Sequence, residues 1–210
     1  LQPAYENILK ESETNRETTM GIYRGSTRLG RTRTRIERRD GGIRMDSDTS
    51  FRLGELLEYL APDVQDIEIK FGAQISPLRG LRTIEVNCPQ LDVSLRGFVQ
   101  DNQLHLRGRA GGQRVNRKVS YSGQPFLADV LSPVTGLPEM DPASPGDTWT
   151  MHMMNPLLGG VQQVRVTLIE KMEVQTAGKL IGVQKLRFRS GGRSWSCCID
   201  GNNRVLVQGT

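Results

Sequence analysis

The feature that most constrains the fold is a long alternation of polar and apolar residues on both sides of Asp40-Gly41. A period of two is typical of a β-strand with one buried face, and a two-residue Asp-Gly loop favours the type I′ turn of a β-hairpin. The sequence therefore predicts a hairpin over residues 31–53 with a defined register. The predicted pairs are Arg33–Asp48, Arg35–Asp46 and Glu37–Arg44 on the polar face, and Thr32–Thr49, Thr34–Ser47 and Ile36–Met45 on the apolar face.

Each charged pair on the polar face of this hairpin combines an arginine with a carboxylate. Such cross-strand pairs contribute about 0.2–1 kcal/mol each, and a register slip of one residue would move them to the buried face. The arginines of this hairpin therefore have partners within the chain before any ligand is considered.

The rest of the chain continues the strand pattern. A second hairpin is predicted over residues 91–109, turning at Asp101-Asn102, and further short alternating runs follow up to residue 207. About ten strands at regular spacing are typical of an all-β protein. We expect a mainly β fold, a curved antiparallel sheet that forms a half-barrel or open barrel, with one to three short helices, candidates being residues 54–60 and 125–131. Residues 1–17 are expected to be a lead-in segment and residues 18–210 a single antiparallel β domain.

The composition agrees with a folded domain. The chain has 210 residues, 36% of them hydrophobic and 24% charged, which suffices for one substantial core and excludes a disordered chain. No apolar run approaches the roughly 20 residues that a membrane-spanning helix needs. The sequence begins at Leu1 rather than Met and holds no signal peptide, so we expect a processed or trimmed chain.

Basic residues gather on the second hairpin without acidic neighbours. The chain has 28 Lys and Arg against 23 Asp and Glu, a net charge of +5. The outward positions of the second hairpin include Phe98 among basic side chains, and the run continues beyond residue 109. The favoured interpretation is a solvated strand face that protects a sheet edge. The alternative is an anion-binding surface for lipid headgroups, an acidic protein or nucleic acid. Its candidate residues are Arg96, His105, Arg107, Arg109, Arg114, Arg117 and Lys118.

The residues that catalysis or metal binding needs are sparse. The histidines are His105 and His152, and a Cys-His-Asp order would leave Cys88 alone as the nucleophile, with no following helix to activate it. We expect Cys88, Cys197 and Cys198 to be structural thiols; a disulfide from Cys88 to either of the others would require an oxidising compartment.

The run Met151-His152-Met153-Met154 could hold copper(I), but methionines that fill a core are the favoured interpretation. The Gly-Gly pairs do not lead into a phosphate-binding helix. We therefore predict no enzyme activity, no catalytic residue, no metal and no cofactor.

Several motifs resemble a bacterial domain of unknown function that often precedes transglutaminase-like domains in envelope proteins. They are Gly21-Ile22-Tyr23-Arg24-Gly25, Leu29-Gly30, Pro145-Gly146-Asp147, Asn155-Pro156 and the segment from Trp195 to Val207. The resemblance implies a curved antiparallel sheet similar to the lipoprotein-carrier (LolA-like) half-barrel and a location in the bacterial envelope or periplasm. Its motifs carry no catalytic residues to transfer.

These observations predict a non-catalytic binding or assembly module of the bacterial envelope. Its concave apolar face would hold an acyl chain or a partner segment, and a protein or lipid partner is favoured over nucleic acid, with peripheral contact to an anionic membrane as a further expectation. The predicted lining residues are Ile36, Met45, Phe51, Leu95, Leu106, Val166, Leu168 and Trp195. The alternative is a binder of nucleic acid or another polyanion through the Arg96–Lys118 face.

Overall fold

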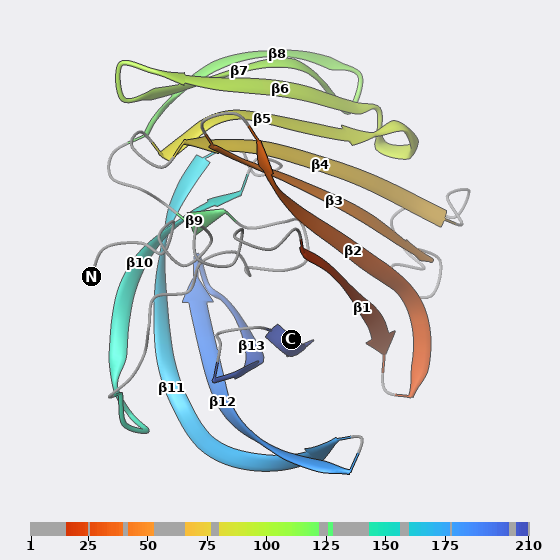
Figure 1. The fold of residues 1–210 in the computed structure, drawn as a ribbon. Helices are drawn as coiled ribbons and strands as arrows, with labels where there is room; N and C mark the ends of the chain where they lie inside the picture. Colours follow the sequence, from red (N-terminus) through yellow and green to blue (C-terminus); the bar gives the residue numbers. More distant parts are fainter. Residues whose placement is uncertain are drawn as a thin grey trace. The chain divides into compact units, whose positions relative to one another are not determined.

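The computed structural model describes residues 16–24, 26–39, 42–52, 66–76, 80–121, 126–127, 143–155, 160–176, 178–201 and 205–209. These residues form fourteen β-strands in two sheets, together with one 3-10 turn, η1 (Pro89–Leu91) (Figure 1). The chain divides into two compact units, Leu9–Ser122 and a second comprising Leu1–Ile8 with Gly123–Thr210. Each unit holds one sheet. The expectation of a single domain over residues 18–210 stays a prediction.

The first sheet is an antiparallel meander in which every strand pairs with the next one along the chain, so that β1 and β8 are its edges. The sheet curves along its strands (Figure 1). Its strands are β1 (Arg16–Arg24), β2 (Thr27–Arg39), β3 (Gly42–Arg52), β4 (Asp66–Ser76), β5 (Gly80–Cys88), β6 (Val93–Gln100), β7 (Gln103–Ala110) and β8 (Gln113–Ser120). Because β1 begins at Arg16, the end of the predicted lead-in segment belongs to the sheet.

The register predicted for the first hairpin is confirmed. In β2 and β3, Arg35 pairs with Asp46 and Ile36 with Met45, and the other predicted pairs match as well. The turn residues Asp40 and Gly41 themselves lie outside the described residues. Ile36 and Met45 therefore lie opposite each other and both face the core, as predicted.

The turn of the second hairpin is also confirmed. Asp101 and Asn102 have φ values of 52° and 56°, the left-handed conformation that a type I′ turn requires at both central positions. The next turn uses Gly111 and Gly112, with φ values of 56° and 78°. These two tight turns hold β6, β7 and β8 in a fixed register, with Leu95, Leu104 and Leu106 buried on the inner face.

The second sheet has the strand order β14-β13-β12-β11-β10-β9. Its strands are β9 (Phe126–Leu127), β10 (Thr148–Asn155), β11 (Gly160–Thr176), β12 (Lys179–Ser190), β13 (Arg193–Asp200) and β14 (Val205–Gly209). Neighbouring strands are antiparallel, except that β9 runs parallel to β10. The buried side chains that this sheet contributes include Val164, Val166, Leu168, Leu186, Phe188, Cys197 and Ile199.

The mainly β fold with curved antiparallel sheets is confirmed, and both sheets are open. The described residues hold more strands than the ten or so expected, because β8 is almost entirely polar and β9 is very short. The helical turn predicted over residues 125–131 is wrong at Phe126 and Leu127, since their backbone pairs with Met153 and Met154 of β10. The helix predicted over residues 54–60 lies outside the described residues.

Within the described residues, no helix is long and apolar enough to cross a membrane.

Candidate anion-binding surface

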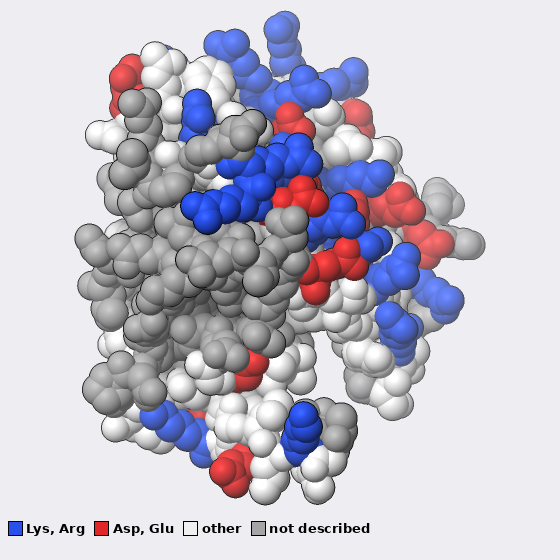
Figure 2. Space-filling view, viewed as in Figure 1, with Lys and Arg blue, Asp and Glu red and all other residues white. Residues whose placement is uncertain are grey.

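Strand pairing brings most of the predicted anion-binding residues onto one face. Across β6, β7 and β8 the directly opposed pairs are Arg96–Arg107, Phe98–His105, His105–Lys118, Arg107–Asn116 and Arg109–Arg114. Opposed residues project from the same side of a sheet. We call this surface the basic face; it comprises Arg96, Phe98, His105, Arg107, Arg109, Arg114, Asn116 and Lys118. Figure 2 shows Lys and Arg side chains gathered over these strands at the top of the view.

Arg117 does not belong to this surface. It pairs with Leu106, whose side chain is buried, so Arg117 projects from the apolar side of the edge strand β8. The sequence grouped the run from Arg114 to Lys118 as one cluster, but neighbouring residues of a strand face opposite ways, so the register separates Arg117 from the other candidate residues. An inward-pointing charge on an edge strand discourages pairing with another chain, and this is the role that the position of Arg117 fits.

Among the described residues, two carboxylates contact arginines of the basic face, both at long distances for an ion pair. Glu85 Oε1 lies 3.7 Å from Arg96 Nε, and Asp92 Oδ2 lies 3.5 Å from Arg109 Nη2. In the described part of the chain, Arg107, Arg114 and Lys118 have no carboxylate within 4.0 Å. All three side chains are exposed to water. The basic face therefore carries positive charge that the neighbouring strands do not neutralise.

An open groove crosses the β7–β8 end of the basic face. Its volume is about 520 Å³, and its lining residues are Arg107, Gly108, Arg109, Gly112, Arg114, Val115 and Asn116. Three guanidinium groups and an amide line this groove. Because each guanidinium presents a planar fork of N–H donors that matches the oxygens of a phosphate or carboxylate, the lining suits an anionic ligand.

An aromatic pair lies beside the groove. The rings of Phe98 and His105 stack with their centroids 4.8 Å apart and an interplanar angle of 9°. The guanidinium carbon of Arg107 lies 6.0 Å from the centroid of the Phe98 ring, at the outer limit of a cation–π contact. Phe98 nevertheless remains 37% exposed. A flat apolar surface is thus available to a ligand in the middle of a cationic face.

Gly108 allows β6 and β7 to approach closely under the groove. Its φ is +146°, and a Cβ at this position would collide with the backbone carbonyl oxygen of Ser94. Its neighbours in sequence are Arg107 and Arg109, whose positions above the sheet depend on this close approach. This close approach could have been predicted from the sequence, because a lone glycine inside a strand is typical of a site where two backbones come close.

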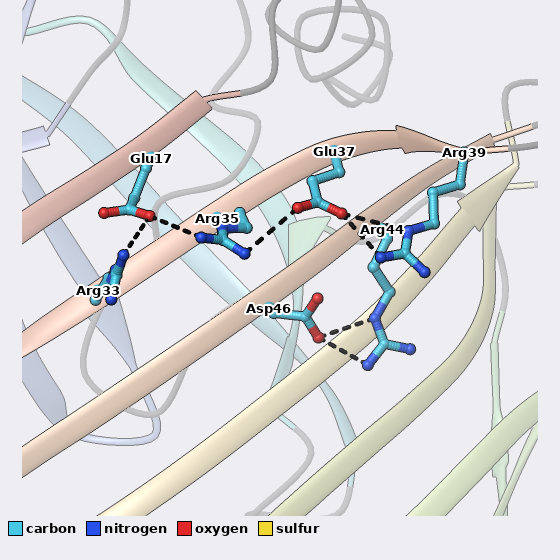
Figure 3. Close-up of polar contacts among 7 residues, drawn as sticks. All are labelled: Glu17, Arg33, Arg35, Glu37, Arg39, Arg44 and Asp46. Atoms are coloured by element: carbon cyan, nitrogen blue, oxygen red, sulfur yellow. Dashed lines mark hydrogen bonds and ion pairs between the residues drawn. The ribbon is translucent and has the colours of Figure 1, made fainter.

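The outer face of β1–β3 is arranged differently. Seven of its charged side chains form ion pairs, which we call the ion-pair ladder: Arg33, Glu17, Arg35, Glu37 and Arg39 are linked in one chain, and Arg44 and Asp46 form a separate pair (Figure 3). Glu17 Oε2 accepts hydrogen bonds from Arg33 Nη2 at 2.6 Å and Arg35 Nη2 at 3.2 Å. The other contacts are Arg35 Nη1–Glu37 Oε1 at 3.6 Å, Arg39 Nη2–Glu37 Oε2 at 3.0 Å and Arg44 Nη2–Asp46 Oδ1 at 2.7 Å.

The ladder differs from the ion pairs that the sequence predicted. Arg33 and Arg35 turn towards Glu17 of β1 rather than towards Asp48 and Asp46, although the backbone register is as predicted. The hydrogen bond from Arg33 is the largest influence on Glu17, and it lowers the pKa of this carboxyl below its ordinary value. Glu17 was missed because it lies in a polar stretch that was assigned to the lead-in segment.

The predicted apolar lining residues are divided between the two sheets. Ile36, Met45, Leu95 and Leu106 are buried on one face of the first sheet, where Phe51 is half-buried. In the second sheet Val166 and Leu168 are buried, and the half-buried Trp195 stacks on Phe188 with centroids 5.5 Å apart. Little of this apolar surface is open to solvent, and the acyl chain or partner segment on it stays a prediction.

The three thiols are free, and burial acts against the use of Cys88 and Cys197 as nucleophiles. Desolvation raises the pKa of the Cys88 thiol and raises that of Cys197 to about 12. A catalytic cysteine needs the opposite shift, because the thiolate is the reactive form. No group of three or more His, Cys, Asp and Glu side chains that could hold a metal ion occurs among the described residues. Met153 is buried as core, while His152 on the same strand is exposed.

Comparisons with known proteins find no matching family model, no matching curated protein and no matching solved structure. The resemblance to the envelope domain therefore stays a prediction.

Proposed function

We propose that the protein is a non-catalytic binding module that holds a phosphate-rich polyanion on its basic face. The observation that carries this proposal is the exposed, uncompensated charge of Arg107, Arg114 and Lys118. Positive side chains arranged in this way attract a polyanion, and binding releases the counterions that the polyanion had condensed.

The spacing of the basic face supports contact with several anionic groups at once. Neighbouring strands lie about 4.8 Å apart, and alternate residues of one strand about 6.7 Å apart. The pairs Arg96–Arg107 and Arg109–Arg114 therefore form a grid over three strands, with Lys118 beyond it. One flexible polyanion can follow this grid, whereas a single small anion would occupy only the groove.

Protection of the sheet edge is the competing explanation for these charges. It accounts for Arg114 and Lys118 on β8, but it does not account for Arg96 and Arg107, which lie on the interior strands β6 and β7. The groove and the exposed Phe98 ring also have no role in edge protection. The envelope location is supported only by the resemblance, and in that setting anionic lipid headgroups would supply the phosphates.

Inorganic polyphosphate tests the proposal, because it offers phosphates and no other recognisable group. We expect the double variant Arg107→Ala/Arg114→Ala to bind polyphosphate at least about tenfold more weakly than the wild type at low salt, since two phosphate contacts are lost. The matched control is Arg33→Ala/Arg35→Ala, which removes the same net charge from the ion-pair ladder and should change the affinity by less than about twofold to threefold.

The dissociation constants can be measured by isothermal titration calorimetry, with circular dichroism to verify that each variant is folded. Equal losses in the two double variants would contradict the proposal, because they would show a response to net charge alone. Absence of polyphosphate binding by the wild type would also overturn it.

A further inference from the structure

Arg107 connects two different kinds of surface on the basic face. Its side chain lines the groove together with Arg109 and Arg114, and its guanidinium carbon lies 6.0 Å from the centroid of the Phe98 ring. A phosphate held by this guanidinium would therefore lie next to an exposed aromatic ring. A ligand that fills both surfaces must carry an anionic group and a flat apolar group close together.

The Phe98 ring is held ready for such a contact. Its stacking on His105 of the neighbouring strand restricts its rotation, and its position on the outer face keeps it out of the apolar core. Because 37% of its surface is exposed, Phe98 stabilises the fold less, through burial of apolar surface, than a fully buried aromatic residue does. An ordered, partly exposed ring among cationic side chains is the arrangement that stacks bases in proteins that bind single-stranded nucleic acid.

We infer that the basic face binds single-stranded nucleic acid, with its phosphates along the groove and a base stacked at Phe98; this inference depends on the proposed polyanion binding. Polyphosphate and lipid headgroups such as phosphatidylglycerol supply phosphates without a flat aromatic ring. A nucleotide supplies both, joined by a covalent backbone. The strand must be single, because in a duplex the faces of the bases are already stacked on one another.

The test compares a fluorescent oligothymidylate with an abasic oligomer of the same length, which has the same phosphates and no bases. We expect the wild type to bind the oligothymidylate at least about fivefold more tightly, the smallest effect typical of one stacked base. Phe98→Leu should remove this preference, so that the variant binds the oligothymidylate and the abasic oligomer equally tightly. Phe98→Tyr should retain it because the ring is retained.

Tyr23→Leu is the matched control, since Tyr23 is a 59% exposed aromatic residue of the same sheet at the opposite edge strand, β1. It should keep the preference for the oligothymidylate. Equal affinity of the wild type for both oligomers would overturn the inference while leaving polyanion binding intact. A preference that survives in Phe98→Leu would also overturn it.

Competition with vesicles distinguishes a membrane from a nucleic acid. Phosphatidylglycerol vesicles that displace the oligothymidylate at a lower phosphate concentration than unlabelled oligothymidylate does would overturn the inference in favour of a membrane surface. Failure of both polyphosphate and the oligomers to bind would overturn the proposed function together with this inference.

Discussion

The outer faces of β1–β3 and β6–β8 belong to the same sheet and are both rich in arginine, yet their charges are compensated very differently. On β1–β3, Arg33, Arg35, Arg39 and Arg44 each contact a carboxylate of the ion-pair ladder. On β6–β8, Arg107 and Arg114 have no such partner among the described residues. The number of arginines on a strand therefore says little about anion binding. The positions of the carboxylates in the strand register decide it.

The register also shows that the basic face costs stability. Arg96 lies opposite Arg107, and Arg109 opposite Arg114. Like charges directly opposite each other in an antiparallel pair are destabilising, whereas the ladder alternates charges of opposite sign. A polyanion bound across these pairs would relieve the repulsion. The two faces thus differ in charge compensation. The arginines of the ladder are paired with carboxylates of the same chain, whereas a bound polyanion would stabilise the basic face.

The largest effect is expected from the backbone beneath the basic face. Gly108→Ala places a Cβ against the Ser94 carbonyl at a positive φ, and it should lower the free energy of unfolding by about 2–4 kcal/mol. Gly72 lies on the outer face beside the ladder, where a Cβ would come within 2.8 Å of Arg44 Nη2 and 3.2 Å of Asp46 Oδ1, the ends of two side chains rather than backbone. Gly72→Ala should therefore cost less than about 1 kcal/mol. Urea unfolding measures both, and an equal cost at the two sites would contradict this difference.

Removing the central carboxylate of the ladder should make that face resemble the basic face. Glu17→Gln leaves Arg33 and Arg35 without their shared partner. We expect the affinity for polyphosphate to rise about threefold to tenfold at low salt, since two further guanidinium groups become available to phosphates. Asp48→Asn removes the same charge from the same face, but Asp48 contacts neither Arg33 nor Arg35 in the ladder, so it is a suitable control. A gain of equal size in Asp48→Asn would show that only net charge matters.

A smaller difference should separate two arginines on the same strand. Arg114→Ala should weaken polyphosphate binding about threefold to fivefold, because Arg114 lines the groove. Arg117→Ala should change it by less than about twofold, because Arg117 projects from the opposite side of β8. Titration calorimetry on the two single variants measures this. If Arg117→Ala weakened binding more than Arg114→Ala, the assignment of the two sides of β8 would be wrong.

The smallest effect concerns the pH dependence of the ladder. Arg33 lowers the pKa of Glu17 below its ordinary value of 4.5, so the ionised carboxyl stabilises the fold above that value. This contribution should be lost as the pH falls through the lowered pKa. The difference between the urea midpoints of the wild type and Glu17→Gln should therefore be present near neutral pH and vanish in acid. It should be small and should decrease with salt, because the pair is exposed. A difference that grew in acid would contradict this account.

The sequence was most informative where local chemistry decides the structure. The turn at Asp101-Asn102 and the alternation around Ile36 and Met45 determine strand register directly, and both predictions are confirmed. The basic face followed from the same alternation. The ion pairs of Glu17 could not be predicted in this way, since a long arginine side chain can reach several carboxylates on neighbouring strands.

Two other features were not predicted. The apolar residues of β8 are only Val115 and Val119, and this weak alternation was not used to separate Arg117 from Arg114. The groove and the Phe98–His105 stack arise only when β6, β7 and β8 lie side by side. The sequence therefore predicted most residues of the basic face, but neither its groove nor the contact between Phe98 and Arg107.

The most direct test of the difference between the two faces is a mass-spectrometric footprint of arginine reactivity towards phenylglyoxal, with and without polyphosphate. A single experiment reads both faces of the same molecule. We expect polyphosphate to protect Arg96, Arg107, Arg109 and Arg114, while the reactivities of Arg33, Arg35, Arg39 and Arg44 remain unchanged. Protection of the ladder arginines to the same extent as those of the basic face would contradict the account.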